Sequence, residues 1–207
     1  MKYVGWVKPG PSFDAILDRE PGPSRTAGIA AWFQSLYGEN AEVPVLVGGA
    51  AVELYTRGAY TTGDLDFVGD VPREVEDQLS AAGFAKKGRH WVHTEGQIFI
   101  ELPARAFDQE TQTDTVVFDD QTIVVVSPED LLVDRLAAWQ FWKVTVEGIN
   151  AFLLWGDRGP EMNAARLENL AEKAGLRTAL QSLRSFAAQG QENPSMEEVE
   201  RWARRVR

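Results

Sequence analysis

Hydrophobic residues follow two different periods along the chain, and each period predicts a different kind of element. Apolar residues three or four apart predict a helix over 25–37, with Ser24 as its cap. Short β-branched runs bounded by Gly, Pro or Asp predict strands. The predicted strands are 43–47, 64–68, 84–86, 90–93, 97–102, 115–118 and 122–126. Helices are predicted at 13–17, 25–37, 50–57 and 73–82.

The pattern changes at Ser127, after which no strand signal remains. Ser127-Pro128-Glu129-Asp130 is typical of a helix start, and Ser195-x-x-Glu198 is a capping-box pattern. The helices predicted after the one that starts at Pro128 are 144–155, 160–174, 176–188 and 195–206. We therefore expect an α/β (α+β) fold in which an α/β core, 1–127, precedes a helical C-terminal region, 128–207.

The amino-acid composition excludes several classes of function. The chain has 207 residues, with 31 acidic and 21 basic side chains and a net charge of −10. Nucleic-acid binding rests on neutralising phosphates with Lys and Arg, so this acidic balance disfavours a general nucleic-acid binder but suits a protein that gathers divalent metal ions. Cysteine is absent and histidine occurs twice, which excludes thiol catalysis and cysteine-based zinc sites.

The longest apolar stretches fall far short of the ~20 residues that span a bilayer. The first ten residues lack the apolar core of a signal peptide. We therefore expect a cytoplasmic protein with no membrane association.

Gly48-Gly49 follows a predicted strand and precedes a predicted helix. Two glycines allow phosphate oxygens to approach backbone N–H groups, and a helix N-terminus adds partial positive charge there. The alternative is a plain turn between a strand and a helix.

Asp64-x-Asp66 lies on the next predicted strand, where alternate side chains share a face. The two carboxylates would stand roughly 6.5–7 Å apart along the strand. Like charges so placed favour a cation between them, and oxygen ligands suit Mg²⁺ or Mn²⁺. The alternative is a solvated face at the edge of a sheet.

Together, the glycine pair and the Asp64-x-Asp66 strand resemble the nucleotidyltransferase superfamily. The wording Gly-Gly-x-Ala-Val-x-x-Tyr…Tyr-Thr-Thr-Gly-Asp-Leu-Asp is similar to bacterial stand-alone proteins near the AbiEii-type toxins and the minimal nucleotidyltransferases. The resemblance covers roughly residues 43–154 and implies a nucleotidyltransferase-type mixed sheet flanked by helices. In this chain 14 residues separate Gly49 from Asp64, slightly more than the general pattern.

The resemblance also implies roles for individual residues. Asp64 and Asp66 would bind both metal ions, and Glu101, the one acid in an apolar strand-like run, would bind the catalytic metal and act as or orient the base. Gly48 and Gly49 would cradle the phosphates, and Thr62 would support their loop. Arg135 stands where these relatives usually carry a lysine that reaches toward the phosphates. Two positions depart from the pattern: Tyr60 replaces an arginine, and Asn150 stands where an acid is expected.

We therefore expect an enzyme that moves a nucleoside monophosphate from a nucleoside triphosphate, with Mg²⁺ or Mn²⁺, to a hydroxyl acceptor. The acceptor is left open between RNA such as a tRNA end, a protein and a small molecule. The departures at Tyr60 and Asn150 motivate the alternative, a degenerate binding or regulatory protein or one half of a toxin–antitoxin pair. A partner protein or a homodimer is compatible with either reading.

The two histidines and three of the tryptophans are expected to have structural rather than functional roles. His90 and His93 would face opposite sides of a strand, so they are not expected to share a metal ion. Trp139, Trp142 and Trp155 are expected to pack in a core rather than to stack on bases.

Overall fold

The computed structural model describes residues 12–38, 41–107, 110–189 and 194–205. The chain divides into two compact units, Met1–Ser127 and Pro128–Arg207. The expected fold class is confirmed: the first unit contains a mixed sheet flanked by helices, and the described part of the second contains helices and turns but no strand.

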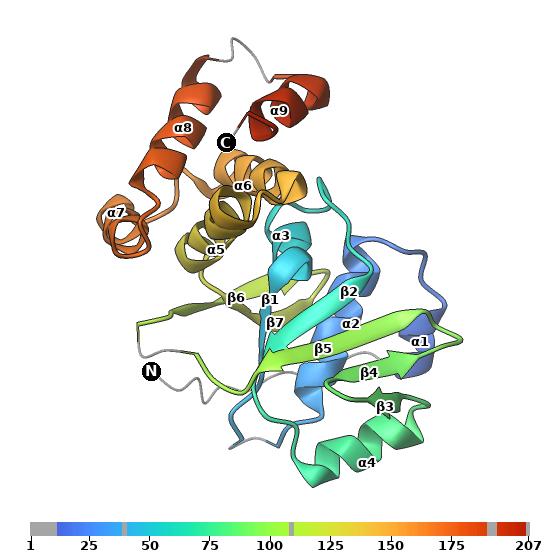
Figure 1. The fold of residues 1–207 in the computed structure, drawn as a ribbon. Helices are drawn as coiled ribbons and strands as arrows, with labels where there is room; N and C mark the ends of the chain where they lie inside the picture. The colour runs from blue at the N-terminus through green and yellow to red at the C-terminus, as the bar shows by residue number, and fades with distance from the viewer. Residues whose placement is uncertain (1–11, 39–40, 108–109, 190–193, 206–207) are drawn as a thin grey trace. The chain divides into compact units, whose positions relative to one another are not determined.

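Among the described residues, seven strands form one sheet in the order β3-β4-β5-β2-β1-β7-β6 (Figure 1). The strands are β1 Val45–Val47, β2 Asp64–Val68, β3 Ala85–Lys87, β4 His90–His93, β5 Ile98–Ala104, β6 Thr113–Phe118 and β7 Gln121–Val126. β2 runs parallel to β5 and antiparallel to β1, and β1 runs parallel to β7. The predicted hairpin is confirmed as β6–β7; it turns through Asp119 and Asp120, which both have positive φ.

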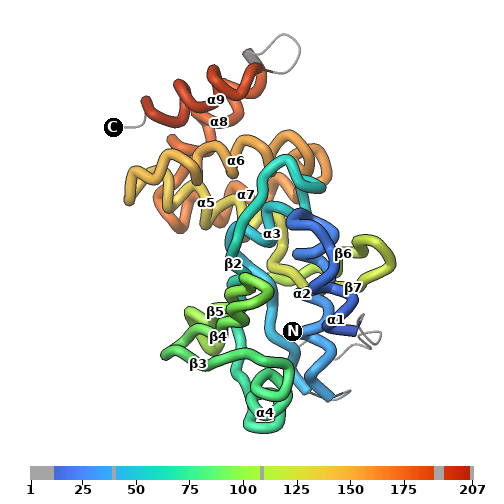
Figure 2. Tube along the Cα trace, turned by 90° about the vertical axis from the view of Figure 1, so that its right-hand side faces the viewer, coloured from blue at the N-terminus to red at the C-terminus, as the bar shows by residue number. Residues whose placement is uncertain are grey.

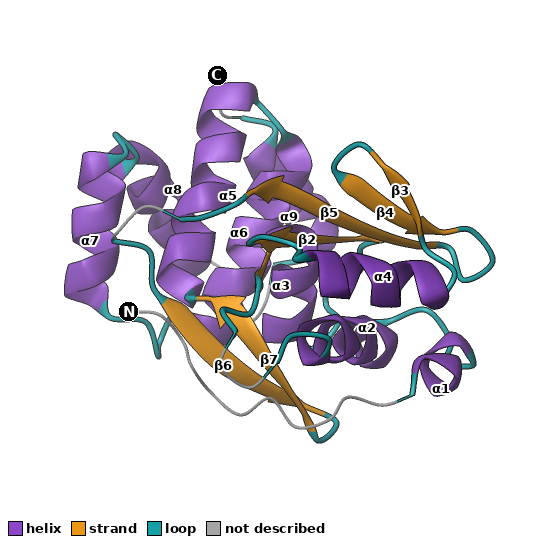
Figure 3. Ribbon diagram, turned by 90° about the horizontal axis from the view of Figure 1, so that it is seen from below, coloured by secondary structure: helices purple, strands orange, loops and turns teal. Residues whose placement is uncertain are grey.

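The helices of the first unit are α1 Phe13–Leu17, α2 Pro23–Ser35, α3 Gly48–Tyr55 and α4 Arg73–Ala81. Figure 3 shows α1, α2 and α4 along one face of the sheet. Phe33 of α2 packs against Phe67 of β2 with ring centroids 4.7 Å apart, so this face is the apolar one. The face of β2 that carries Asp64 and Asp66 is therefore the opposite one.

Gln34 of α2 joins two strands within the core. Its amide nitrogen donates to the carbonyls of Pro44 and Val124 at 2.8 Å each, and its amide oxygen accepts from the Val124 N–H at 2.9 Å. Figure 2 shows α2 beside β7, on which it packs. This fully buried amide satisfies backbone groups where β1 and β7 meet.

Two predicted helix starts are wrong by about half a turn. α2 begins at Pro23 after Gly22, so Ser24 lies inside the helix and is not its cap; proline fits the first helical position, where its missing N–H costs no bond. α3 begins at Gly48 rather than at Ala50. The glycine pair therefore forms the first turn of α3.

The helices of the second unit are α5 Pro128–Trp142, α6 Thr145–Arg158, α7 Ala164–Lys173, α8 Arg177–Gln189 and α9 Met196–Ala203. The capping box at Ser195 and Glu198 is confirmed. α7 begins later than predicted because Asn163 caps it by accepting the Arg166 N–H. Trp139 is buried and its indole N–H donates to the Ala203 carbonyl at 2.7 Å.

Trp142 does not pack in a core, contrary to expectation. It lies at the end of α5 and is 75% exposed. Lys143, the next residue, has a positive φ and lies outside the helix. In the described part of the chain no helix is both long and apolar enough to cross a membrane.

Candidate functional site

The register of the sheet places the three predicted carboxylates on one face. β2 and β5 run parallel, and Asp66 is paired with Glu101. Alternate residues of a strand share a face, so Asp64 lies on the same face as Asp66 and Glu101, while Leu65 and Phe67 are buried on the other. Neighbouring strands lie about 4.8 Å apart, so the backbones of Asp66 and Glu101 are close neighbours.

Asp66 also lies against Gly48, the first residue of α3. β1 and β2 are antiparallel with Val47 paired to Asp66, which brings the start of α3 to this carboxylate. A Cβ at Gly48 would overlap the Asp66 carboxylate and stand 3.1 Å from its Cγ. Gly48 also has φ +69°, a conformation that side chains rarely adopt. Both the backbone and the neighbouring carboxylate thus require glycine here.

Gly49 faces the segment that leads into β2. A Cβ at Gly49 would stand 3.2 Å from Thr62 Oγ1 and 3.2 Å from a ring carbon of Tyr60. Thr62 Oγ1 accepts the Asp64 N–H at 3.5 Å. Thr62 therefore lies between the glycine pair and the first carboxylate of β2, and Tyr60 packs on the same helix start.

Glu101 is held by an arginine. Arg89 Nε lies 2.7 Å from Glu101 Oε1, and His90 Nδ1 lies 3.6 Å from Oε2. The Glu101 side chain is only 21% exposed, whereas that of Arg89 is 62% exposed. His90 and His93 face opposite sides, as predicted, because His93 is buried and its Nδ1 accepts the Gly96 N–H. Arg89 is thus a neighbour of the site that no sequence motif marks.

The carboxylates of Asp64, Asp66 and Glu101 are of the chemical type that binds a divalent cation, because carboxylate oxygens are the ligands that Mg²⁺ and Mn²⁺ prefer. The described residues nevertheless contain no group of three or more His, Cys, Asp or Glu side chains placed to hold a metal ion as they stand. Glu101 is turned to Arg89, and Asp64 stands at the exposed start of β2. A site built from Asp64, Asp66 and Glu101 stays a prediction that requires these side chains to converge.

Arg135 belongs to the second unit, on α5. Its Nη1 lies 2.9 Å from Glu147 Oε2 and its Nη2 pairs with the Asp134 carboxylate. Burial alone would lower its pKa, but these two carboxylates more than offset it, and the pKa is raised above the ordinary value. Asn150 donates to the same Glu147 oxygen at 3.2 Å. The acid of α6 that forms an ion pair with Arg135 is therefore Glu147, one turn before Asn150.

The first unit holds a polar pocket of about 320 Å³ near the Glu101 counter-ion. It is lined by Gly69, Asp70, Val71, Glu76, Lys86, Gly88, Arg89, Trp91, Leu102 and Arg105. Lys86 pairs with Glu76, and Arg105 with Asp70 at 3.4 Å, so its cations are largely matched by anions. Arg89 borders both this pocket and Glu101.

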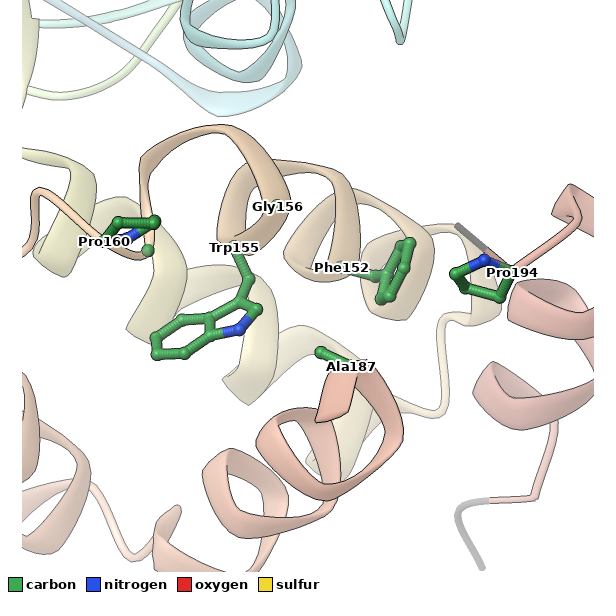
Figure 4. A pocket seen from close by; sticks show the side chains of 7 residues that line it. Phe152, Trp155, Gly156, Pro160, Ala187 and Pro194 are labelled. Atoms are coloured by element: carbon green, nitrogen blue, oxygen red, sulfur yellow. The ribbon is translucent and has the colours of Figure 1, made fainter. Parts of the chain in front are cut away.

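A second pocket, of about 370 Å³, lies within the second unit (Figure 4). It is lined by Phe152, Trp155, Gly156, Gly159, Pro160, Ala187 and Pro194. None of these side chains carries a charge, so this pocket is unsuited to a triphosphate.

Comparison with known proteins gives little. No family model and no curated protein matches the chain. Among solved structures, it is similar to an antigenic nucleotidyltransferase-like protein from Paracoccidioides brasiliensis, with 17% identity and a TM-score of 0.44 over 69% of this chain and 84% of that one. We therefore draw the function from the residues of this chain.

Proposed function

We propose that this protein is a divalent-metal-dependent nucleotidyltransferase, which moves a nucleoside monophosphate from a triphosphate to a hydroxyl acceptor. The observation that carries the proposal is the position of Asp66, which lies against Gly48 at the start of α3 and is paired with Glu101. Carboxylates that would bind the metal ions therefore lie beside backbone N–H groups that would bind phosphate oxygens.

The residues divide the work by chemistry. The first turn of α3 at Gly48 and Gly49 would bind phosphate oxygens, with Thr62 supporting the approach. Asp64 and Asp66 would hold Mg²⁺ or Mn²⁺, which when bound would neutralise the charge that develops on the leaving pyrophosphate. Val47, the N-cap of α3, has no side-chain oxygen to satisfy the first N–H groups of the helix, which suits them to an anion.

Glu101 would serve the acceptor. Released from Arg89, it would take the proton from the acceptor hydroxyl as that oxygen bonds to the α-phosphorus. The bond from the α-phosphorus to the pyrophosphate oxygen breaks in the same displacement, so pyrophosphate leaves. Arg89, so freed, would act as a counter-ion to the phosphates. A phosphate-binding role for Arg135 rests on the resemblance alone.

The test is label transfer from each α-labelled ribonucleoside triphosphate, with Mg²⁺ or Mn²⁺, to a cell extract containing RNA, protein and small molecules. We expect transfer by the natural chain and its loss on Asp64→Asn or Asp66→Asn. Asp77→Asn, on the exposed side of α4, is the matched control and should leave transfer unchanged. Transfer that survives both site substitutions would rule out the assigned carboxylates.

A binding or regulatory protein on the same fold is the second candidate. It is favoured by the ion pairs that occupy Glu101 and Arg135. Such a protein would bind a triphosphate without turnover and act through a partner protein or a second copy, as half of a toxin–antitoxin pair would. Calorimetry that shows metal-dependent triphosphate binding, with no pyrophosphate released over hours, would favour this candidate. For both candidates we propose a cytoplasmic location.

A further inference from the structure

Glu53 is a fully buried carboxyl group on α3, and the nucleotidyltransferase proposal assigns it no role. It lies about one and a half turns after Gly48, and its exposed fraction is 0%. A glutamate almost never sits at such a position unless it is paired. Among the described residues, no basic group forms an ion pair with Glu53. Burial raises the pKa of its carboxyl group.

The Glu53 carboxyl group joins two other parts of the first unit. Its Oε2 accepts the hydroxyl of Thr26 on α2 at 3.1 Å and the backbone N–H of Thr62 at 3.3 Å. The backbone carbonyl of Glu53 accepts the Gly58 N–H at 2.9 Å. The connection between α3 and β2 is therefore bonded to Glu53 close to its start and close to its end.

The far end of this connection reaches the proposed site. Thr62 lies against Gly49, and its side-chain oxygen accepts the Asp64 N–H. The connection from the end of α3 to β2 spans residues 56–63, so a bond to Thr62 restricts it where it approaches the glycine pair. An apolar side chain of similar size would fill the space of Glu53 but leave the Thr62 N–H and the Thr26 hydroxyl unpaired.

We propose that Glu53 is a positioning residue of the nucleotide site, which through its bond to the Thr62 N–H holds Thr62 against Gly49 and, through the Thr62 hydroxyl, orients the start of β2 at Asp64. This inference rests on the proposed function. The bond to the Thr62 N–H alone acts on the site, whereas the bond to the Thr26 hydroxyl links α3 to α2 and contributes to stability. The role requires an oxygen acceptor at this place and does not require a negative charge.

The test compares Glu53→Gln, Glu53→Leu and Thr26→Val. Two quantities are measured: the hydrogen exchange of the Thr62 amide in the free protein, and the affinity for each ribonucleoside triphosphate with Mg²⁺ by calorimetry. Glutamine keeps a carbonyl oxygen for both donors, so both quantities should stay within about twofold of the natural chain. Leucine removes the acceptor, and we expect on the order of tenfold faster exchange and tenfold weaker affinity.

Thr26→Val is the matched control. It removes the other bond of the same carboxyl group, so it should lower thermal stability yet leave the Thr62 amide protected and the affinity unchanged. If Glu53→Leu does not fold, Glu53→Asp, whose shorter side chain cannot reach both donors, replaces it with the same expected losses. Equal losses of affinity in Thr26→Val and in the Leu or Asp variant would reduce Glu53 to a structural residue and overturn the inference.

The two proposals fail separately. A natural chain that binds none of the triphosphates defeats the proposed function and, with it, the assignment of Glu53 to a nucleotide site. A natural chain that binds a triphosphate while Glu53→Leu keeps both affinity and Thr62 protection defeats the positioning role alone.

Discussion

Arg89 and Glu101 form an ion pair at the face of the sheet where the candidate metal ligands stand, with Nε and Oε1 2.7 Å apart. Glu101 is also paired in register with Asp66 on the neighbouring parallel strand. Two carboxylates on adjacent strands repel each other unless a cation lies close by. Arg89 supplies that cation in the chain itself.

Removing Arg89 should therefore strengthen metal binding. In Arg89→Gln, the guanidinium group no longer competes with a divalent cation for the Glu101 carboxylate. We therefore expect Mn²⁺ to bind about two- to fivefold more tightly. The gain is modest because half-exposed ion pairs contribute little free energy. Electron paramagnetic resonance of free Mn²⁺ measures the affinity, and Arg105→Gln, which unpairs Asp70 in the neighbouring pocket, is the control. Unchanged or weaker binding in Arg89→Gln contradicts the competition.

Gly48→Ala should damage both stability and the site. The added methyl group overlaps the Asp66 carboxylate, and the positive φ at this position is strained for alanine. We expect a loss of about 1–3 kcal/mol in the free energy of unfolding and a loss of triphosphate binding. Gly38→Ala is the control, because nothing lies within 4 Å of its Cβ position. Chemical denaturation and calorimetry provide the two readouts.

Glu53 should make stability depend on pH. Its folded-state pKa is raised above the ordinary 4.5, chiefly by burial, so the folded protein holds this proton more tightly than the unfolded chain does. Its contribution to stability is therefore complete below about pH 4.5 and is lost as the pH rises through the raised value. Glu53→Gln cannot lose a proton, so this decrease should be absent from the variant and should appear as the difference in unfolding free energy between the two proteins as the pH rises. An unchanged pH dependence contradicts the burial effect.

Gln34→Leu should destabilise the first unit strongly. The substitution leaves the carbonyls of Pro44 and Val124 and the Val124 N–H without their partner inside the core. We expect a loss of about 3 kcal/mol in the free energy of unfolding. Gln78→Leu on exposed α4 removes only long, solvent-accessible bonds and should cost less than about 0.5 kcal/mol. Denaturant unfolding of both variants checks the difference.

Arg135→Met should destabilise the second unit by about 3 kcal/mol, because Glu147 is then left with little solvent and no cation. The double variant Arg135→Met/Glu147→Met should recover a large part of this loss. Thermal unfolding of the single and double variants measures the coupling, with Arg204→Met, whose pair with Glu200 is exposed, as the control. A double variant no more stable than Arg135→Met contradicts an energetic coupling of the two groups.

Local patterns were sufficient to predict most elements of the fold. The strands at 64–68 and 90–93 and the helix at 13–17 have the predicted bounds, because apolar runs and flanking turn residues act within a few residues of each other. Helix starts were predicted less well. The helix predicted to start after Ser24 starts at Pro23 after Gly22, and the backbone turns with a positive φ at Lys143, directly after the exposed Trp142.

The candidate site was predicted only in part for a related reason. Asp64 and Asp66 could be selected because they alternate on one predicted strand, and Glu101 because the resemblance implies a third carboxylate in an apolar strand. Arg89 and Glu53 could not, because their partners lie 12 and 9 residues away in sequence and no local pattern marks a bond between them. The one sequence signal for Glu53 is its position as the single charged residue in the apolar stretch 48–55.

Local periodicity and residue chemistry predict the succession of strands and helices, the side chains of a strand that share a face, and the acids that could bind a metal ion. The tertiary fold adds that Asp66 lies beside Gly48 and opposite Glu101, that Arg89 pairs with Glu101, and that Glu53 accepts the Thr62 N–H. The physical reason is that strand register and side-chain pairing are settled by packing across the whole sheet, where residues far apart in the chain compete for the same partners.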